Sequence, residues 1–239
     1  HDITIKRGYS IPYPGFCRDY TNKCFPHTDM GTSTDPYETI IWTDTDTHTI
    51  YFYSEKDIIY VNEDAKGMFN DIMKNAGSGS VTIDLTGLDF SKAKDLTNLF
   101  AKNKIKSIEW GNFNTESAET VSKMFRDVEP TNPATFSIDF TKFNTRNVRD
   151  FSYMFNGSKI SSLNLNGIDT RNATNMAGMF SSMSNLSALD VAPLNTSNVT
   201  DMSSMFASMH SLTDIQNLSS LDTSRVESMS SMFSDLGSI

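Results

Sequence analysis

Residues 195–206 read NTSNVTDMSSMF, and residues 169–180 read DTRNATNMAGMF, a near copy 26 residues earlier. Both stretches end in Met-Phe, and this dipeptide, once as Leu-Phe, recurs along the chain every 25 to 31 residues. Its phenylalanines are Phe69, Phe100, Phe125, Phe155, Phe180, Phe206 and Phe233. Self-similarity at a steady period is the signature of a repeat architecture, so the stretch predicts about seven units of about 25 residues.

Each unit has a fixed set of apolar positions whose period changes within the unit. Leu189 and Val191 alternate with polar neighbours, which is typical of a strand, whereas residues 199–206 are apolar at i, i+3, i+6 and i+7, which is typical of a helix. The polar run 195–198 between them, with Asp201 three residues after Asn198, predicts a helix cap with a capping box. The same apolar columns begin, in four earlier units, at Ile83, Ile108, Ile138 and Leu163.

One strand and one short helix cannot bury enough apolar surface to offset the entropy of ordering the unit. The units must therefore stack, each strand pairing with the next. We predict an α/β fold: a leucine-rich-repeat-like solenoid of strand-plus-short-helix repeats with a parallel sheet, over residues 61–239. In the last unit the strand half, around Ile215 and Leu218, contains one extra residue.

Residues 1–60 do not fit the repeat. The segment 38–64, ETIIWTDTDTHTIYFYSEKDIIYVNED, reads as strands separated by polar turns, so we expect a β-rich N-terminal cap that contains a hairpin. Nothing similar follows the last Met-Phe pair. We therefore expect the natural chain to continue with further repeats, or this end to be covered by self-association.

Composition limits the partners. The chain has 239 residues and a formal net charge of −9, with Lys and Arg scattered, which argues against nucleic acid and anionic lipid as partners. No apolar stretch is long enough for a membrane helix, so we expect no membrane insertion. The two cysteines, Cys17 and Cys24, lie in a loop-like segment. In an oxidising compartment they would form a disulfide; free thiols and, more weakly, a zinc site are the alternatives.

The stretches LDVAPLNTSNVTDMSSMFASMHSL (189–212) and IDFTKFNTRNVRDFSYMFNGSKI (138–160) resemble a known bacterial repeat, close to LDLSNFDTSNVTDMSGMFSGCSSL. That repeat belongs to BspA-like, leucine-rich-repeat-related surface proteins of Firmicutes and mycoplasmas, the DUF285 family. The resemblance covers about residues 58–239. It implies an exported bacterial cell-surface protein with an adhesin-like role and no catalytic motif. The family often has a Cys shortly after Met-Phe, where this chain has Met183, Met209 and Leu236.

The strand residues that face away from the core form a polar column: Asp84, Glu109, Asp139, Asn164, Asp190 and the less regular Gln216. Carboxylates stacked about 4.8 Å apart repel unless water, a cation or a basic partner meets them. One interpretation is a solvated sheet face, and the other is an acidic recognition surface for a protein or glycan. Glycosidase-type catalysis is disfavoured because it needs a concave pocket.

Other chemistry-bearing residues have structural interpretations. Nine of the 13 methionines fall in the apolar columns and predict core packing rather than copper binding. Asp44 and Asp46 begin like a calcium loop, but the glycine and the distal glutamate are missing, which favours a hairpin turn. The four histidines lack metal-ligand spacing, and no common nucleotide-binding or hydrolase motif occurs. We therefore expect no metal, no cofactor and no enzymatic activity.

These observations predict a non-enzymatic, adhesin-like binding module on the bacterial cell surface. Its partner would be a protein or glycan of host or neighbouring cells, bound by the sheet face or by aromatic residues of the cap. These aromatics are Tyr9, Tyr13, Phe16, Tyr20, Tyr51 and Tyr53. A structural spacer or self-assembling filament subunit is the alternative.

Overall fold

The structure is a computed structural model that describes residues 2–8, 24–26, 40–44, 48–53, 58–72 and 79–237. Seven strands form the largest sheet, in the order β2-β3-β4-β1-β6-β8-β9. Their bounds are β1 Ile3–Arg7, β2 Cys24–Pro26, β3 Ile40–Asp44, β4 Thr49–Tyr53, β6 Val81–Asp84, β8 Lys104–Glu109 and β9 Glu129–Pro130. The predicted N-terminal hairpin is confirmed, because β3 and β4 pair antiparallel.

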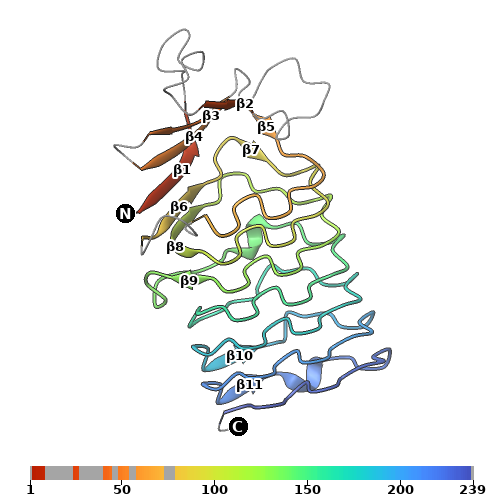
Figure 1. The fold of residues 1–239 in the computed structure, drawn as a ribbon. Helices are drawn as coiled ribbons and strands as arrows, with labels where there is room; N and C mark the ends of the chain where they lie inside the picture. The colour runs from red at the N-terminus through yellow and green to blue at the C-terminus, as the bar shows by residue number, and fades with distance from the viewer. Residues whose placement is uncertain are drawn as a thin grey trace.

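Strand β1 joins the N-terminal strands to the repeats. It pairs parallel with β4 on one side and parallel with β6, the first strand of the repeat columns, on the other. The pairs β6–β8 and β8–β9 are parallel too. The N-terminal hairpin and the first repeats therefore share one sheet (Figure 1).

Two smaller sheets and two 3-10 helices complete the regular elements of the described residues. Strand β5 (Ile59–Tyr60) pairs with β7 (Leu88–Asp89), and β10 (Ala188–Asp190) pairs with β11 (Asp214–Gln216); both pairs are parallel. The 3-10 helices are η1 (Phe140–Lys142) and η2 (Leu218–Ser220).

A row of isolated parallel bridges joins each repeat to the next. The bridging residues are Asp64, Asp95, Thr120, Asp150, Asn175, Asp201 and Ser228. Figure 1 shows the repeats side by side in sequence order, from the N-terminal strands at one end to the blue C-terminal repeats at the other. The predicted parallel pairing between repeats is confirmed, and the chain is mostly non-helical.

The predicted helices are wrong in the described part of the chain. Residues 199–202 are extended or irregular around the bridge at Asp201. Consecutive turns follow, in which the N–H of Met205 donates to the carbonyl of Met202 (3.2 Å), while the N–H of Phe206 donates to Met232 of the next repeat (3.0 Å). Ser204, between Met202 and Met205, has a φ of 55°, a left-handed conformation that interrupts a right-handed helix. Alternate N–H groups thus bond to the neighbouring repeat instead of to a helical carbonyl four residues back.

The strand half is also less regular than predicted. Residues 138–143 contain the 3-10 helix η1, and the side chain of its N-cap residue, Asp139, accepts a hydrogen bond from the backbone N–H of Thr141 (3.0 Å). Residues 163–165 form no strand, and there Asn164 accepts from the N–H of Asn166 (3.0 Å). Asp84 and Asp190 accept the same kind of bond at the ends of β6 and β10, so this turn occurs in repeats with and without a strand.

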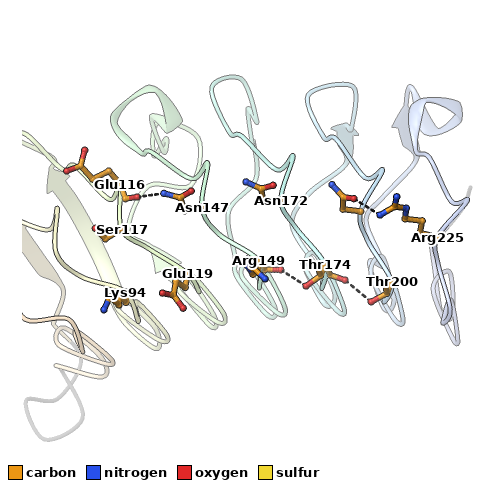
Figure 2. A pocket seen from close by; sticks show the side chains of 11 residues that line it. Lys94, Glu116, Ser117, Glu119, Asn147, Arg149, Asn172, Thr174, Thr200 and Arg225 are labelled. Atoms are coloured by element: carbon orange, nitrogen blue, oxygen red, sulfur yellow. Dashed lines mark hydrogen bonds between the residues drawn. The ribbon is translucent and has the colours of Figure 1, made fainter.

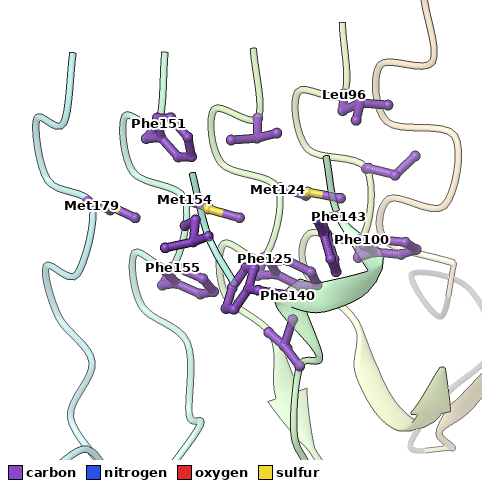
Figure 3. Packing of buried hydrophobic residues seen from close by; sticks show 14 of the residues in the cluster. Leu96, Phe100, Met124, Phe125, Phe140, Phe143, Phe151, Met154, Phe155 and Met179 are labelled. Carbon is purple, nitrogen blue, oxygen red and sulfur yellow. The ribbon is translucent and has the colours of Figure 1, made fainter. Parts of the chain in front are cut away.

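The apolar columns of the repeats form a continuous core. The phenylalanines of successive Met-Phe pairs stack in a row, with ring centroids 5.4 to 5.9 Å apart. Figure 3 shows Phe100, Phe125 and Phe155 in this row, beside Met124 and Met154. Most methionines of the columns are buried, which confirms the core interpretation.

The extra residue predicted in the last repeat lies after β11. Strands β10 and β11 pair in register, with Asp190 opposite Gln216, an offset of 26 residues, whereas the bridge Asp201–Ser228 has an offset of 27. The added residue therefore lies between Gln216 and Ser228. There Asn217 takes a left-handed conformation, with a φ of 58°, and begins η2.

Candidate functional site

A polar groove of about 920 Å³ crosses six consecutive repeats. Its lining residues are Lys94, Glu116, Ser117, Glu119, Asn147, Arg149, Asn172, Thr174, Asn198, Thr200 and Arg225. Figure 2 shows these side chains following one another from repeat to repeat along one face. We call this surface the repeat groove.

Two sequence positions supply nearly the whole groove. The residue directly before each bridging residue forms one wall: Lys94, Glu119, Arg149, Thr174 and Thr200. The residue three positions before each bridge forms the other: Ser117, Asn147, Asn172, Asn198 and Arg225. Because bridges hold the repeats in register, equivalent side chains are expected to recur at the spacing of parallel strands, about 4.8 Å.

The asparagine wall is held by bonds between repeats. The side-chain amides of Asn147, Asn172 and Asn198 donate to the backbone carbonyls of Glu116, Arg146 and Arg171, each over 2.8 Å. A carbonyl oxygen only accepts, so each contact must use one N–H of Nδ2, which leaves the second N–H and the acceptor Oδ1. The amide orientations are therefore set by the fold.

The threonines of the first wall, Thr174 and Thr200, also donate to backbone carbonyls of the preceding repeat. The hydroxyl of Thr174 donates to the carbonyl of Arg149 (3.3 Å), and the hydroxyl of Thr200 donates to the carbonyl of Thr174 (3.2 Å). Each hydroxyl has one proton, so its lone pairs remain as acceptors. Figure 2 shows these bonds as a line along the groove.

A column of buried threonines fixes the loops that carry the asparagines. The hydroxyl of Thr170, 1% exposed, donates to the carbonyl of Asn195 (3.0 Å) and accepts from its N–H (2.8 Å). Thr115 makes the same pair of bonds to Asn144. The run NTSN is thus a clip between repeats, and the predicted helix cap is wrong. Likewise, Asp201 accepts from the N–H of Ser203 two residues on (2.8 Å), instead of forming a capping box.

Charged side chains lie at both ends of the groove and within it. Lys94 pairs with Glu63 (2.7 Å), and the hydrogen bond and charge of Glu63 raise the pKa of Lys94. Arg225 donates to Oδ1 of Asn198 (2.9 Å). The exposed side chain of Arg149 has no hydrogen bond or ion pair within the described part of the chain.

Comparison with known proteins bears on the same residues. The family model described as "Mycoplasma protein of unknown function, DUF285" matches residues 63–188 and 158–239. The chain belongs to the DUF285 family. Its matched region contains every residue of the repeat groove. No curated protein and no solved structure matches the chain.

The strand-face column predicted for this DUF285 chain lies outside the repeat groove. Register brings Asp84 beside Glu109 and Asp190 beside Gln216, but residues 138–143 and 163–165 lack strands that would continue the row. Of the five predicted site residues, Asp84 is half-buried and the others, Glu109, Asp139, Asn164 and Asp190, are exposed. A ligand role for these five residues stays a prediction.

Several of these side chains stabilise turns. The hydroxyl and then the backbone N–H of Thr141 lower the pKa of Asp139. The backbone N–H of Ala192 and then the amide of Asn217 lower the pKa of Asp190. These carboxylates are therefore engaged with the chain's own donors.

Some predicted features lie outside the described residues. Tyr9, Tyr13, Phe16, Cys17, Tyr20 and Asp46 lie there, as do the side chains of Cys24, Asp44 and Tyr53. Tyr51 is described, and Lys6 lies over its ring, with Nζ 5.4 Å from the centroid.

The described residues include neither a metal-ligand cluster nor a membrane-crossing helix. They contain no group of three or more His, Cys, Asp or Glu side chains placed to hold a metal ion. They also contain no helix with the length and apolar character needed to cross a membrane.

Sequence reasoning missed the groove-lining residues of this DUF285 chain. A signal was present, because Asn147, Asn172 and Asn198 occupy one column of the repeat. We interpreted that column as a helix cap, and only the neighbouring repeat reveals that its amides bond to the preceding backbone.

Proposed function

We propose that this DUF285 chain is a non-enzymatic, adhesin-like binding module exposed on the bacterial cell surface. In this proposal the repeat groove holds a protein or glycan ligand of host or neighbouring cells. The observation that supports it most is the fixed orientation of the groove's polar groups. A site whose hydrogen-bonding atoms are held before the ligand arrives loses less entropy on binding.

We further propose that the repeats form a leucine-rich-repeat-like solenoid of the BspA-like type. The row of parallel bridges from Asp64 to Ser228 and the stack of phenylalanines support this architecture. In a solenoid each repeat contacts mainly its neighbours, and a column of side chains becomes an extended binding surface. The groove has this form.

The composition of the groove favours recognition over reaction. Its amides, hydroxyls and charged groups are spread over six repeats, which suits an extended ligand. A catalytic site instead gathers a nucleophile, a base and oxyanion donors around one reacting atom. The net charge of −9 supports a partner other than nucleic acid.

A blocking substitution tests the proposal. The whole chain is titrated against a panel of matrix proteins, glycans and intact host and bacterial cells, as wild type and as Thr174→Trp, which fills the middle of the groove with an indole. Thr135→Trp is the matched control, because Thr135 is equally exposed and lies outside the groove.

We expect the wild type and Thr135→Trp to bind the same panel members and Thr174→Trp to lose them. If Thr174→Trp bound its ligands as the wild type does, the groove would not be the ligand site. The strand face around Glu109 and Asp190 would then be the alternative site. Concentration-dependent assembly in light scattering, without any panel ligand, would favour the alternative of a structural spacer or self-assembling subunit.

A further inference from the structure

The ligand class can be narrowed from the hydrogen-bond balance of the groove, and the inference rests on the proposed binding function. One N–H of each amide and the single proton of each threonine hydroxyl are used by backbone carbonyls, and the second N–H of each amide remains. Beside these amide N–H groups, the middle of the groove offers a series of acceptors: Oδ1 of Asn147 and Asn172, and the hydroxyl oxygens of Thr174 and Thr200. A complementary ligand must present hydrogen-bond donors in series.

The spacing of these acceptors separates a glycan from a peptide. Equivalent side chains of parallel-paired repeats recur about every 4.8 Å. Groups on one face of an extended peptide recur at about 6.8 Å, because successive side chains alternate and each residue advances about 3.4 Å. The groups of an extended peptide therefore no longer lie opposite the acceptors of the groove after a few repeats. The hydroxyls of a linear pyranose chain recur at a length close to that of one repeat, and every ring carries donors.

Arg149 adds the requirement that the ligand carry a negatively charged group. Its exposed guanidinium has no acidic partner among the described residues, although the chain has 29 acidic and only 20 basic residues. It lies beside the acceptors, between Glu119 and Thr174 in the same wall (Figure 2). A free guanidinium fork is the side chain best suited to grip a carboxylate through two parallel bonds.

The other charges limit how acidic the ligand is. Besides Arg149, the lining contains Lys94 and Arg225 as cations and Glu116 and Glu119 as anions. Lys94 is already paired with Glu63, and Arg225 is bonded to Asn198. A densely charged polyanion would meet the two glutamates and be repelled. A ligand with carboxylates spaced among neutral sugars avoids that repulsion.

We propose that the repeat groove binds a linear, sparsely acidic glycan that lies along the row of repeats. Its hydroxyls donate to the oxygens of Asn147, Asn172, Thr174 and Thr200. One of its carboxylates is held by the guanidinium of Arg149.

Matched pairs of glycans test this inference with the whole chain. Decasaccharides of hyaluronan and unsulfated chondroitin, in which acidic and neutral sugars alternate, are titrated against the protein, each beside its carboxyl-reduced, neutral counterpart. Heparin of equal length is included as a dense polyanion. The proteins are wild type, Arg149→Ala and the control Arg146→Ala, whose exposed arginine lies on the same repeat but outside the groove.

We expect at least one acidic decasaccharide to bind, and its neutral counterpart to bind about tenfold or more weakly, as the loss of a charge-assisted pair implies. Arg149→Ala should remove this preference and leave the affinity for the neutral form unchanged. Arg146→Ala should behave as wild type.

Three results would overturn the inference: no acidic decasaccharide binds, acidic and neutral forms bind equally, or heparin binds tightest with a steep loss of affinity in salt. Thr174→Trp separates this failure from failure of the proposed function. If a protein ligand is lost in Thr174→Trp while no glycan binds, the groove is a binding site and the glycan assignment is wrong. If Thr174→Trp affects no ligand at all, both proposals fall.

Discussion

At the scale of single residues, the turns of the repeats depend on left-handed backbone positions. The residue two before each stacked phenylalanine has a positive φ, as does the residue two after it. The first column is Gly67, Asn98, Lys123, Tyr153, Gly178, Ser204 and Ser231; the second is Asp71, Lys102, Asp127, Gly157, Ser182, Ser208 and Asp235. Most are not glycine, so the structure accepts an unfavourable conformation at nearly every repeat.

Gly167 combines a positive φ with a close approach to the backbone of another repeat. Its φ is 95°, and an added Cβ would lie 2.9 Å from the backbone nitrogen of Thr141 in the preceding repeat, a neighbour that cannot turn away. Gly167→Ala should lower the free energy of unfolding by roughly 2 to 5 kcal/mol, from backbone strain and overpacking together. Urea denaturation followed by circular dichroism measures the change.

Gly178→Ala is the comparison for Gly167→Ala. Its φ is 60°, but the added Cβ would meet the ring of Tyr153, which is 38% exposed and can swing outward. This variant should lose mainly the backbone contribution, about 1 to 2 kcal/mol. An equal or larger loss of stability in Gly178→Ala would show that the contact with the backbone of the preceding repeat does not cause the loss in Gly167→Ala.

At the scale of elements, neighbouring repeats are joined by two internal columns, the buried threonines and the stacked phenylalanines. Thr115, Thr145, Thr170 and Thr196 are each 1 to 2% exposed, and each bonds to the backbone of the following repeat. A short repeat with little regular secondary structure is thus held by polar clips on one side and by ring stacking on the other.

Thr170→Val tests the clip. Valine keeps the shape of threonine but leaves the N–H and carbonyl of Asn195 without their partner, so unfolding should become easier by about 1 to 3 kcal/mol. Thr170→Ser keeps the hydroxyl and should cost only about 1 kcal/mol for the missing methyl group. If serine proved as harmful as valine in urea denaturation, the methyl group and not the clip would carry the effect.

Phe155→Ala tests the stack. Phe155 is fully buried between Phe125 and Phe180, with ring centroids 5.6 and 5.9 Å away, and its truncation should cost about 3 to 5 kcal/mol. Phe233 contacts one ring of the row, Phe206, and is 45% exposed, so Phe233→Ala should cost much less. Similar losses for the two variants, measured by thermal unfolding, would contradict an energetic role for the continuous stack.

At the scale of the whole molecule, aspartates that cap turns couple stability to pH. Hydrogen bonds from Thr141, Ala192 and Ser224 lower the pKa values of Asp139, Asp190 and Asp222 below 3.8. A lowered pKa in the folded state gives stability that is present above pH 3.8 and is lost as the pH falls through the folded values. The melting temperature should therefore decrease on acidification below about pH 4.

The triple variant Asp139→Asn, Asp190→Asn and Asp222→Asn should show a shallower loss in this range, because asparagine accepts the same bonds without titrating. A pH profile as steep as that of the wild type would show that these three aspartates are not responsible.

The organisation of the molecule was largely predictable from its sequence, because the buried positions recur in every sequence repeat. The Met-Phe period located the row of Phe69 to Phe233, and the offset near Ile215 located the extra residue beside η2. The predicted helices failed for a physical reason. The apolar spacing of residues 199–206 is shared by a helix and by a series of turns, and only bonds to the next repeat distinguish the two.

The groove was harder to predict because it is a property of pairs of repeats. Asn172 is a turn residue within its own repeat, and the orientation of its amide is defined only by the carbonyl of Arg146 in the repeat before. That Arg149 has no side-chain partner among the residues the structure describes likewise depends on the side chains of neighbouring repeats. Such residues can be identified from the sequence when each position of a repeat is compared with the positions that it faces in the repeats on either side.

The most direct test of the central claim, that the repeat groove and not the strand face is the ligand site, is one affinity comparison. The same panel ligand is titrated against wild type, the groove variant Arg149→Ala with Thr174→Trp, and the strand-face variant Glu109→Gln with Asp190→Asn. The account predicts that the groove variant loses about tenfold or more in affinity and that the strand-face variant binds as wild type. Normal binding by the groove variant, with loss in the strand-face variant, would contradict it.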